Sequence, residues 1–133
     1  MKFSLLLSIL AIVALALVGC RQSAGGVPLA TQTSDIRIDL AYEPIPPVVG
    51  EAALTVRLMR GDGTPVSDAT VSVRGDMDHA GMQPVEAVGE RISDGLYRVP
   101  FTWTMAGDWI VTITATLPDG TSTLSRFDLT VGS

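Results

Sequence analysis

From Asp35 onward, hydrophobic and polar residues alternate with a period of two rather than 3.6. In DIRIDLA, residues 35–41, two isoleucines and a leucine fall on one face and the charged residues fall on the other. Strict alternation with one polar face is typical of half-buried antiparallel strands. The pattern recurs along the chain and predicts six strong strands, over residues 35–41, 52–60, 69–75, 95–103, 108–116 and 121–131.

A seventh, weaker strand is predicted over PVEAVGERI, residues 84–92, where Gly89 could form a bulge. The turn sequences RGDGTP, SDG and PDG punctuate the strands, and no segment after residue 20 has the period of a helix. Seven short strands separated by such turns predict an all-β fold. We expect a seven-stranded immunoglobulin-like antiparallel β-sandwich.

The order of the strands predicts which connections meet. Successive antiparallel strands alternate in direction, so their connections fall alternately at the two ends of the sandwich. One end should hold the start of the first strand and the connections 61–68, 93–94 and 117–120. The other end should hold the connections 42–51, 76–83 and 104–107.

Methionine and histidine are unevenly divided between these two ends. The stretch GDMDHAGMQP, residues 75–84, contains the single histidine of the chain and two of its five methionines. The connection 104–107 adds a third methionine, whereas Met59 ends a strand at the opposite end. The predicted topology therefore gathers four side chains at one end: Met77, His79, Met82 and Met105.

The N-terminal segment has a different character. A positively charged Lys2 precedes an apolar run from Phe3 to Val18, which is short for a membrane span and typical of a secretory signal. The ending LVGC, residues 17–20, resembles a bacterial lipobox, which implies cleavage before Cys20 and lipid attached to it. An uncleaved anchor helix is the alternative.

The lipoprotein interpretation predicts three segments. Residues 1–19 form a lipoprotein signal peptide, residues 20–34 comprise the lipidated Cys20 and a flexible tether, and residues 35–133 form the β-sandwich domain. The protein should then be exported and anchored through its lipid to a bacterial membrane. Its domain would lie on the extracytoplasmic face, in the periplasm or at the cell surface.

Charge and cysteine content exclude several classes of function. The chain has nine Lys and Arg against fourteen Asp and Glu, a net charge of −5. Removal of residues 1–19 takes away only Lys2, leaving eight Arg and a net charge of −6. An acidic domain without lysine is a poor binder of nucleic acid and a mild attractor of cations. Because Cys20 is the one cysteine, an internal disulfide is excluded.

The gathered side chains suggest a soft metal. Thioether sulfur is a poor ligand for Zn²⁺, Mg²⁺ or Ca²⁺ and a good one for Cu(I), while imidazole binds both copper states. Structural zinc sites use four Cys or His ligands, and here one histidine would have only Asp76 and Asp78 beside it. Methionine also fills gaps in cores, so ordinary packing remains an alternative, above all for Met105.

Two stretches carry a resemblance to a known family. GDMDHAGMQPV and DGLYRVPFTWTMAGDWIVTI resemble the YtkA-like family of secreted β-sandwich domains, related in outline to FixH-type and CopC-type proteins. The family is regarded as a copper- or heavy-metal-associated periplasmic or extracellular module. Carried over to this chain, it implies the ligands His79, Met82 and Met105, with Met77 as a fourth. The N-terminal histidine of CopC-type sites has no counterpart here.

We therefore expect a membrane-tethered module that binds or handles Cu(I), for metal delivery or homeostasis. Its expected partners are the membrane, through lipid on Cys20, and an oxidase-assembly or metal-efflux protein. An enzyme is not expected, because His79 stands beside no evident serine nucleophile. The alternative is an immunoglobulin-like module that binds a membrane-protein partner, without metal, through the same loop end.

Overall fold

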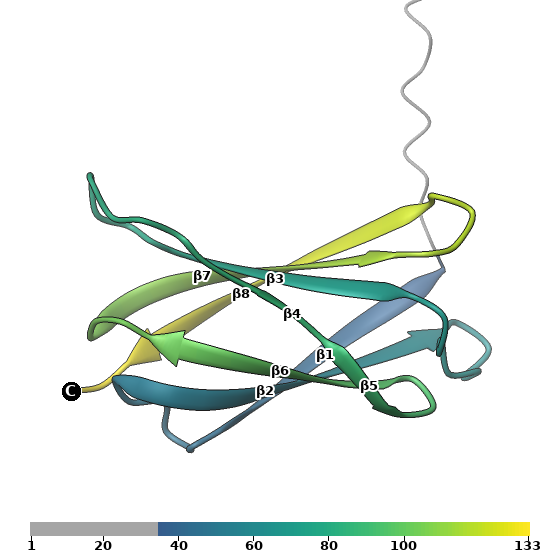
Figure 1. The fold of residues 1–133 in the computed structure, drawn as a ribbon, viewed down its shortest axis with the longest axis horizontal. Coiled ribbons are helices and arrows are strands. Elements are labelled where there is room, and N and C mark those ends of the chain that lie inside the picture. The colour runs from purple at the N-terminus through teal and green to yellow at the C-terminus, as the bar shows by residue number, and fades with distance from the viewer. Residues whose placement is uncertain (1–34) are drawn as a thin grey trace, which may run out of the picture. The chain divides into compact units, whose positions relative to one another are not determined.

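The structure is a computed structural model that describes residues 35–133. The expected signal peptide, Cys20 and tether lie outside the described residues. The described part is all-β, and within it no helix is long and apolar enough to cross a membrane (Figure 1). Its strands are β1 (Ile36–Glu43), β2 (Gly50–Arg60), β3 (Thr70–Met77), β4 (Val85–Val88), β5 (Glu90–Ser93), β6 (Leu96–Trp103), β7 (Gly107–Thr116) and β8 (Ser122–Val131).

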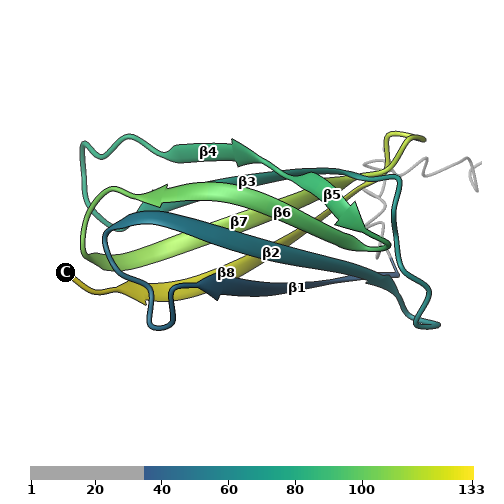
Figure 2. The same ribbon diagram turned by 60° about the horizontal axis from the view of Figure 1, so that its bottom comes forward.

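The strands form two antiparallel four-stranded sheets that pack face to face (Figure 2). One sheet has the order β1-β2-β6-β5 and the other β4-β3-β7-β8. This is the strand order of an immunoglobulin-type sandwich with one extra strand on the second sheet. The predicted fold class is confirmed.

The predicted number of strands was too low by one because the expected strand 84–92 changes sheets. β4 pairs with β3, whereas β5 pairs with β6 in the other sheet, and Gly89 lies between them. The Gly89 amide donates to the Val71 carbonyl at 2.8 Å. A Cβ at Gly89 would lie 3.1 Å from Cγ2 of Val99. A larger residue at this point of the chain would therefore have little room for its side chain. The expected bulge is therefore a sheet-to-sheet crossing.

The core consists of the inward positions of the alternating strands. Tyr97, Val99, Phe101 and Trp103 of β6 are all buried, as the alternation predicts. Trp109 of β7 is 1% exposed. Phe127 of β8 is partly buried and packs against the core.

Tyr97 ties the connection between β2 and β3 to the core. Its hydroxyl donates to the Val66 carbonyl at 3.0 Å and accepts from the Ala69 amide at 3.2 Å. Burial raises the pKa of Tyr97 above its ordinary value. The hydroxyl thus satisfies two backbone groups of an irregular segment that no strand partner satisfies.

The buried hydrophobic side chains of the described residues all lie between Ile36 and Val131. The described residues, 35–133, belong to one compact unit with this core. A domain of this size with a complete core is large enough to fold by itself.

Replacement of Trp109, the aromatic residue of β7, tests the assignment of the core. Trp109→Ala should reduce the free energy of unfolding by about 3–5 kcal/mol, because it removes a large buried side chain and leaves a cavity. Urea denaturation measures the effect. Leu124→Ala is the control, since Leu124 is an exposed side chain on β8. An equal, small loss in both variants would contradict this assignment of the core.

A second substitution tests the role of the Tyr97 hydroxyl. Tyr97→Phe should reduce the free energy of unfolding by about 1–3 kcal/mol, because two backbone groups lose their partner.

The raised pKa of Tyr97 also determines the direction in which stability changes with pH. The unfolded chain releases the phenol proton near pH 10 while the folded protein retains it, so this stability is present below about pH 10 and is lost as pH rises further. Denaturation curves between pH 8 and pH 11 should show a shallower alkaline loss in Tyr97→Phe than in the wild type. Parallel pH profiles of the two proteins would refute this role.

Candidate functional site

Three connections lie together at one end of the sandwich, at the left of Figure 1: residues 44–49, 78–84 and 104–106. The strand register requires this arrangement, because Met77 pairs with Trp109 and Gly50 pairs with Trp103. At the opposite end, the Gly61 amide donates to the Asp35 carbonyl at 2.9 Å. The predicted division of connections between the two ends is confirmed. We call residues 44–52, 76–84, 101–110 and 128–133 the Met/His end.

His79 and Met82 lie at the two ends of a tight turn. Gly81 has a φ of +85° in the third position of the turn His79-Ala80-Gly81-Met82, as a type II turn requires. The Met82 amide approaches the His79 carbonyl at 3.5 Å. The first and last Cα atoms of such a turn lie within about 7 Å of each other. The imidazole and the thioether therefore leave the chain at neighbouring points.

Met77 is the last residue of β3, and Met105 lies in the turn between β6 and β7. A Cβ at Gly107 would lie 3.0 Å from Cε of Met77, so the Met77 methyl group rests over Gly107. The indole Nε1 of Trp109 donates to the Met105 carbonyl at 3.0 Å. Trp109 is also the strand partner of Met77. One residue therefore holds the backbone of both methionines.

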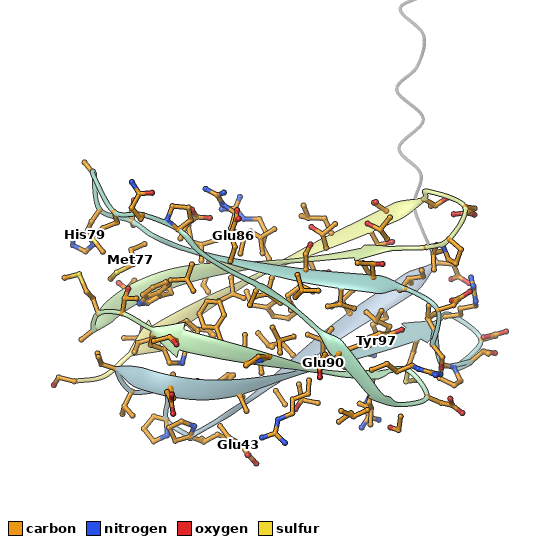
Figure 3. The ribbon with its side chains drawn as sticks, in the orientation of Figure 1. Glu43, Met77, His79, Glu86, Glu90 and Tyr97 are labelled. Carbon is orange, nitrogen blue, oxygen red and sulfur yellow. The ribbon has the colours of Figure 1, made fainter. Side chains whose placement is uncertain are left out.

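The four side chains differ in exposure. His79 is exposed and Met105 is 48% exposed, whereas Met77 and Met82 are half-buried. Figure 3 shows Met77 and His79 at the same end, with His79 farther out. Met59 lies at the opposite end, where it bridges to Pro65, as the predicted topology requires.

The aromatic part of the core forms the floor of this end. The ring centroid of Trp103 lies 4.8 Å from that of Phe101 and 5.2 Å from that of Trp109, both in edge-on contact. Gly75 of β3 is buried against the cluster, since a Cβ there would lie 2.7 Å from Cζ of Phe101. The loop that holds His79 thus leaves β3 directly above packed rings.

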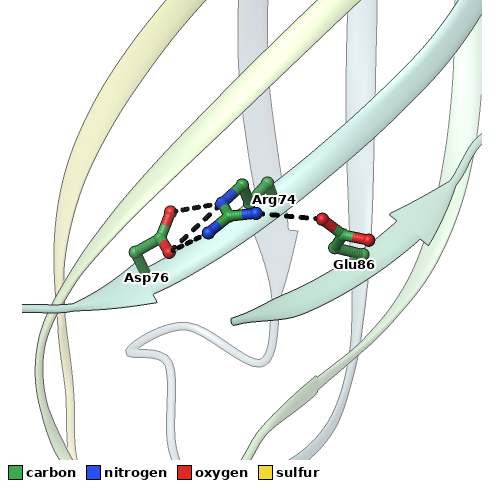
Figure 4. A network of polar contacts seen from close by, with 3 residues as sticks. All are labelled: Arg74, Asp76 and Glu86. Atoms are coloured by element: carbon green, nitrogen blue, oxygen red, sulfur yellow. Dashed lines mark hydrogen bonds and ion pairs between the residues drawn. The ribbon is translucent and has the colours of Figure 1, made fainter. Parts of the chain in front are cut away.

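Asp76, considered as a possible hard ligand, is engaged elsewhere. Arg74 donates from Nε and Nη2 to its carboxylate, at 2.9 and 3.0 Å, and from Nη1 to Glu86 at 3.0 Å (Figure 4). The hydrogen bonds that Arg74 donates to Asp76 raise the pKa of the guanidinium above its usual value. Asp76 therefore belongs to a surface ion-pair network on β3 and β4.

Asp78 faces a shallow hollow at the same end. The hollow has a volume of about 350 Å³ and is lined by Asp78, Asp108 and Asp128 together with residues of β7 and β8. Asp108 accepts a hydrogen bond from the Thr130 hydroxyl at 2.7 Å. No group of three or more His, Cys, Asp or Glu side chains within residues 35–133 is arranged to hold a metal ion.

A larger hollow, of about 670 Å³, lies on the outer face of the β4-β3-β7-β8 sheet. Ser72, Thr114 and Leu124 are among its lining residues, and none of the methionines or His79 takes part. It is therefore separate from the candidate site.

Some features of this end were missed by the sequence analysis. The links through Gly107 and through the Trp109 indole depend on side-chain packing that alternation does not report. The Arg74 network was also missed, although the spacing of Arg74 and Asp76 on one strand face was visible in the sequence.

Comparison with solved structures gives the same fold. The soluble domain of PmoD from Methylocystis sp. ATCC 49242 (Rockwell) superposes with a TM-score of 0.51 at 13% identity, covering 76% of this chain and 99% of that one. MtrC from Shewanella baltica OS185 gives a TM-score of 0.45 at 14% identity, covering 73% of this chain and 22% of that one. The likeness to the PmoD domain concerns the fold alone. Among curated proteins, no sequence matches this chain.

The family comparison reaches the same segments that carried the sequence resemblance. The model of the YtkA-like family matches residues 30–114, which include the turn 79–82 and the connection 104–106. This match spans well over half of the 133 residues, and the chain therefore belongs to the YtkA-like family.

Proposed function

We propose that this protein binds Cu(I) on the extracytoplasmic side of a bacterial membrane and serves in copper delivery or homeostasis. The observation that supports the proposal is the position of His79 and Met82 at the two ends of one tight turn, with Met77 and Met105 at the same end of the sandwich. These residues include every methionine of the described domain except Met59.

The chemistry of these donors favours Cu(I). Thioether sulfur is soft and uncharged, and it binds Cu(I) far better than it binds hard divalent ions. Membership of a family regarded as copper- or heavy-metal-associated supports the same conclusion.

Each side chain has a distinct role in the proposal. His79 and Met82 form the first pair of ligands, because the turn holds them close. Met105 supplies a third ligand from a turn that Trp109 holds in place. Met77 is more sheltered, against Gly107, and assists or exchanges with the others. A site with one imidazole and uncharged sulfurs can release its cargo without breaking a thiolate bond.

If Cys20 carries a lipid, the domain is attached through the end opposite the Met/His end, because residue 35 lies there. This arrangement suits exchange of copper with an oxidase-assembly or metal-efflux protein. We assign no catalytic role to the domain.

A competition titration with a Cu(I) chelator tests the proposal. The chain from residue 21 onward should bind one Cu(I), and His79→Ala, Met82→Leu and Met105→Leu should each weaken binding by about tenfold or more. Leucine approximates the volume of methionine, so packing is nearly retained. Affinity should fall at acidic pH, because a protonated imidazole cannot ligate, but a methionine-dependent part should remain.

Met59→Leu is the matched control, since Met59 lies at the opposite end and should leave the affinity unchanged. Cu(I) should also raise the melting temperature of the wild type by mass action, and less so that of the three site variants. Wild-type affinity in all three site variants would place the copper site elsewhere or remove it altogether.

A further inference from the structure

The Met/His end also carries a patch of exposed apolar side chains that no part of the described domain covers. Ile45 is 78% exposed, and Val48, Val49 and Met105 are 36%, 43% and 48% exposed. They make up four of the seven exposed large hydrophobic side chains in residues 35–133. Exposed apolar side chains that adjoin one another are a mark of interaction sites, whereas scattered single residues are not.

These side chains come from adjoining segments. Gly50 pairs with Trp103, so the connection 44–49 and the turn 104–106 leave neighbouring ends of β2 and β6. We call Ile45, Val48, Val49 and Met105 the apolar patch.

The connection that carries most of the patch is held firmly. The Val49 amide donates to the Gly132 carbonyl at 2.9 Å, and the Gly132 amide donates to the Pro47 carbonyl at 2.8 Å. Three of the six residues in 44–49 are prolines, whose φ angles are fixed. Ile45 is therefore presented to solvent by an ordered segment, and its docking would cost little conformational entropy.

The charged side chains that belong to the Met/His end are all acidic, although Arg74 of β3 reaches one of them. The Met/His end contains no Lys or Arg, whereas it contains five carboxylates: Glu51, Asp76, Asp78, Asp108 and Asp128. Of these, Asp76 is paired with Arg74. The seven arginines of the described residues all lie outside this end. An apolar centre with a polar rim is the usual anatomy of a protein interface, and the carboxylates of this end are polar groups of that kind.

We propose that the Met/His end is a docking face for a partner protein with an apolar contact surface rimmed by Lys and Arg. Complementary charge would steer the encounter, and the apolar patch would supply the buried centre. If a second copy of this chain docked on this end through its own Met/His end, the carboxylates of the two copies would repel each other. An anionic lipid surface would be repelled in the same way. The proposal does not require bound copper.

The test uses two peptides that differ only in charge, on metal-free protein from residue 21 onward. One is acetyl-Lys-Leu-Lys-Leu-Lys-amide, and the other replaces each Lys with Glu. Amide chemical shifts in ¹⁵N spectra map the binding. The Lys peptide should give saturable shifts in residues 44–49, 78–84 and 104–106, and its binding should weaken as salt rises. The Glu peptide should give none.

Matched variants separate this face from general stickiness. Ile45→Ser and the double variant Asp78→Asn with Asp108→Asn should each weaken binding of the Lys peptide by about fivefold or more. Ile92→Ser removes an equally apolar side chain, 57% exposed on β5, and Asp68→Asn removes a carboxylate near the opposite end. Both controls should bind the peptide like the wild type.

Several results would overturn the proposal. These are equal binding of the two peptides, shifts centred on other residues, equal losses in the control variants, or no saturable binding up to about 5 mM peptide. Self-association that Ile45→Ser abolishes would identify a second copy as the occupant instead. Because no metal is present, failure of the copper titration would leave this result unaffected.

Discussion

The contact on which this end of the molecule depends is the edge-on packing of Trp109 against Trp103, with Phe101 beside them. Gly75 makes the contact possible, because a side chain there would collide with the Phe101 ring. The same Trp109 uses its indole Nε1 to hold the Met105 carbonyl and pairs with Met77 along the strand. The core therefore positions the loops that carry the candidate ligands, and disturbance of the rings would reach both.

The alternation of the sequence was sufficient to predict the strands, their antiparallel order and the end at which each connection lies. It could not predict the crossing at Gly89, because that crossing is decided by contacts with Val71 and Val99 from two different sheets. For the same reason it missed the anchoring of residues 44–49 to Gly132, near the far end of the chain. Local patterns report faces of strands, whereas these features depend on residues distant in sequence.

Met105 takes part in both the proposed copper site and the proposed docking face. Its side chain is both a candidate soft ligand and part of the exposed apolar patch. A thioether can serve in both roles because it carries no charge and costs little to bury. A partner that covered the patch would therefore contact a copper ligand directly, and it could replace that ligand by one of its own. Met77, held against Gly107, would stay out of reach during such an exchange.

The absence of Lys and Arg from this end is better explained by a partner protein than by copper itself. A unit charge about 10 Å away contributes only about 0.4 kcal/mol in water, and salt at physiological strength screens much of that. A single Cu(I) ion would thus gain little from surface carboxylates such as Asp108 and Asp128. A partner with several basic side chains would bring each of them close to a carboxylate, and the gains in encounter rate would add. The charge pattern is therefore suited to the recognition of a macromolecule that meets the whole end at once.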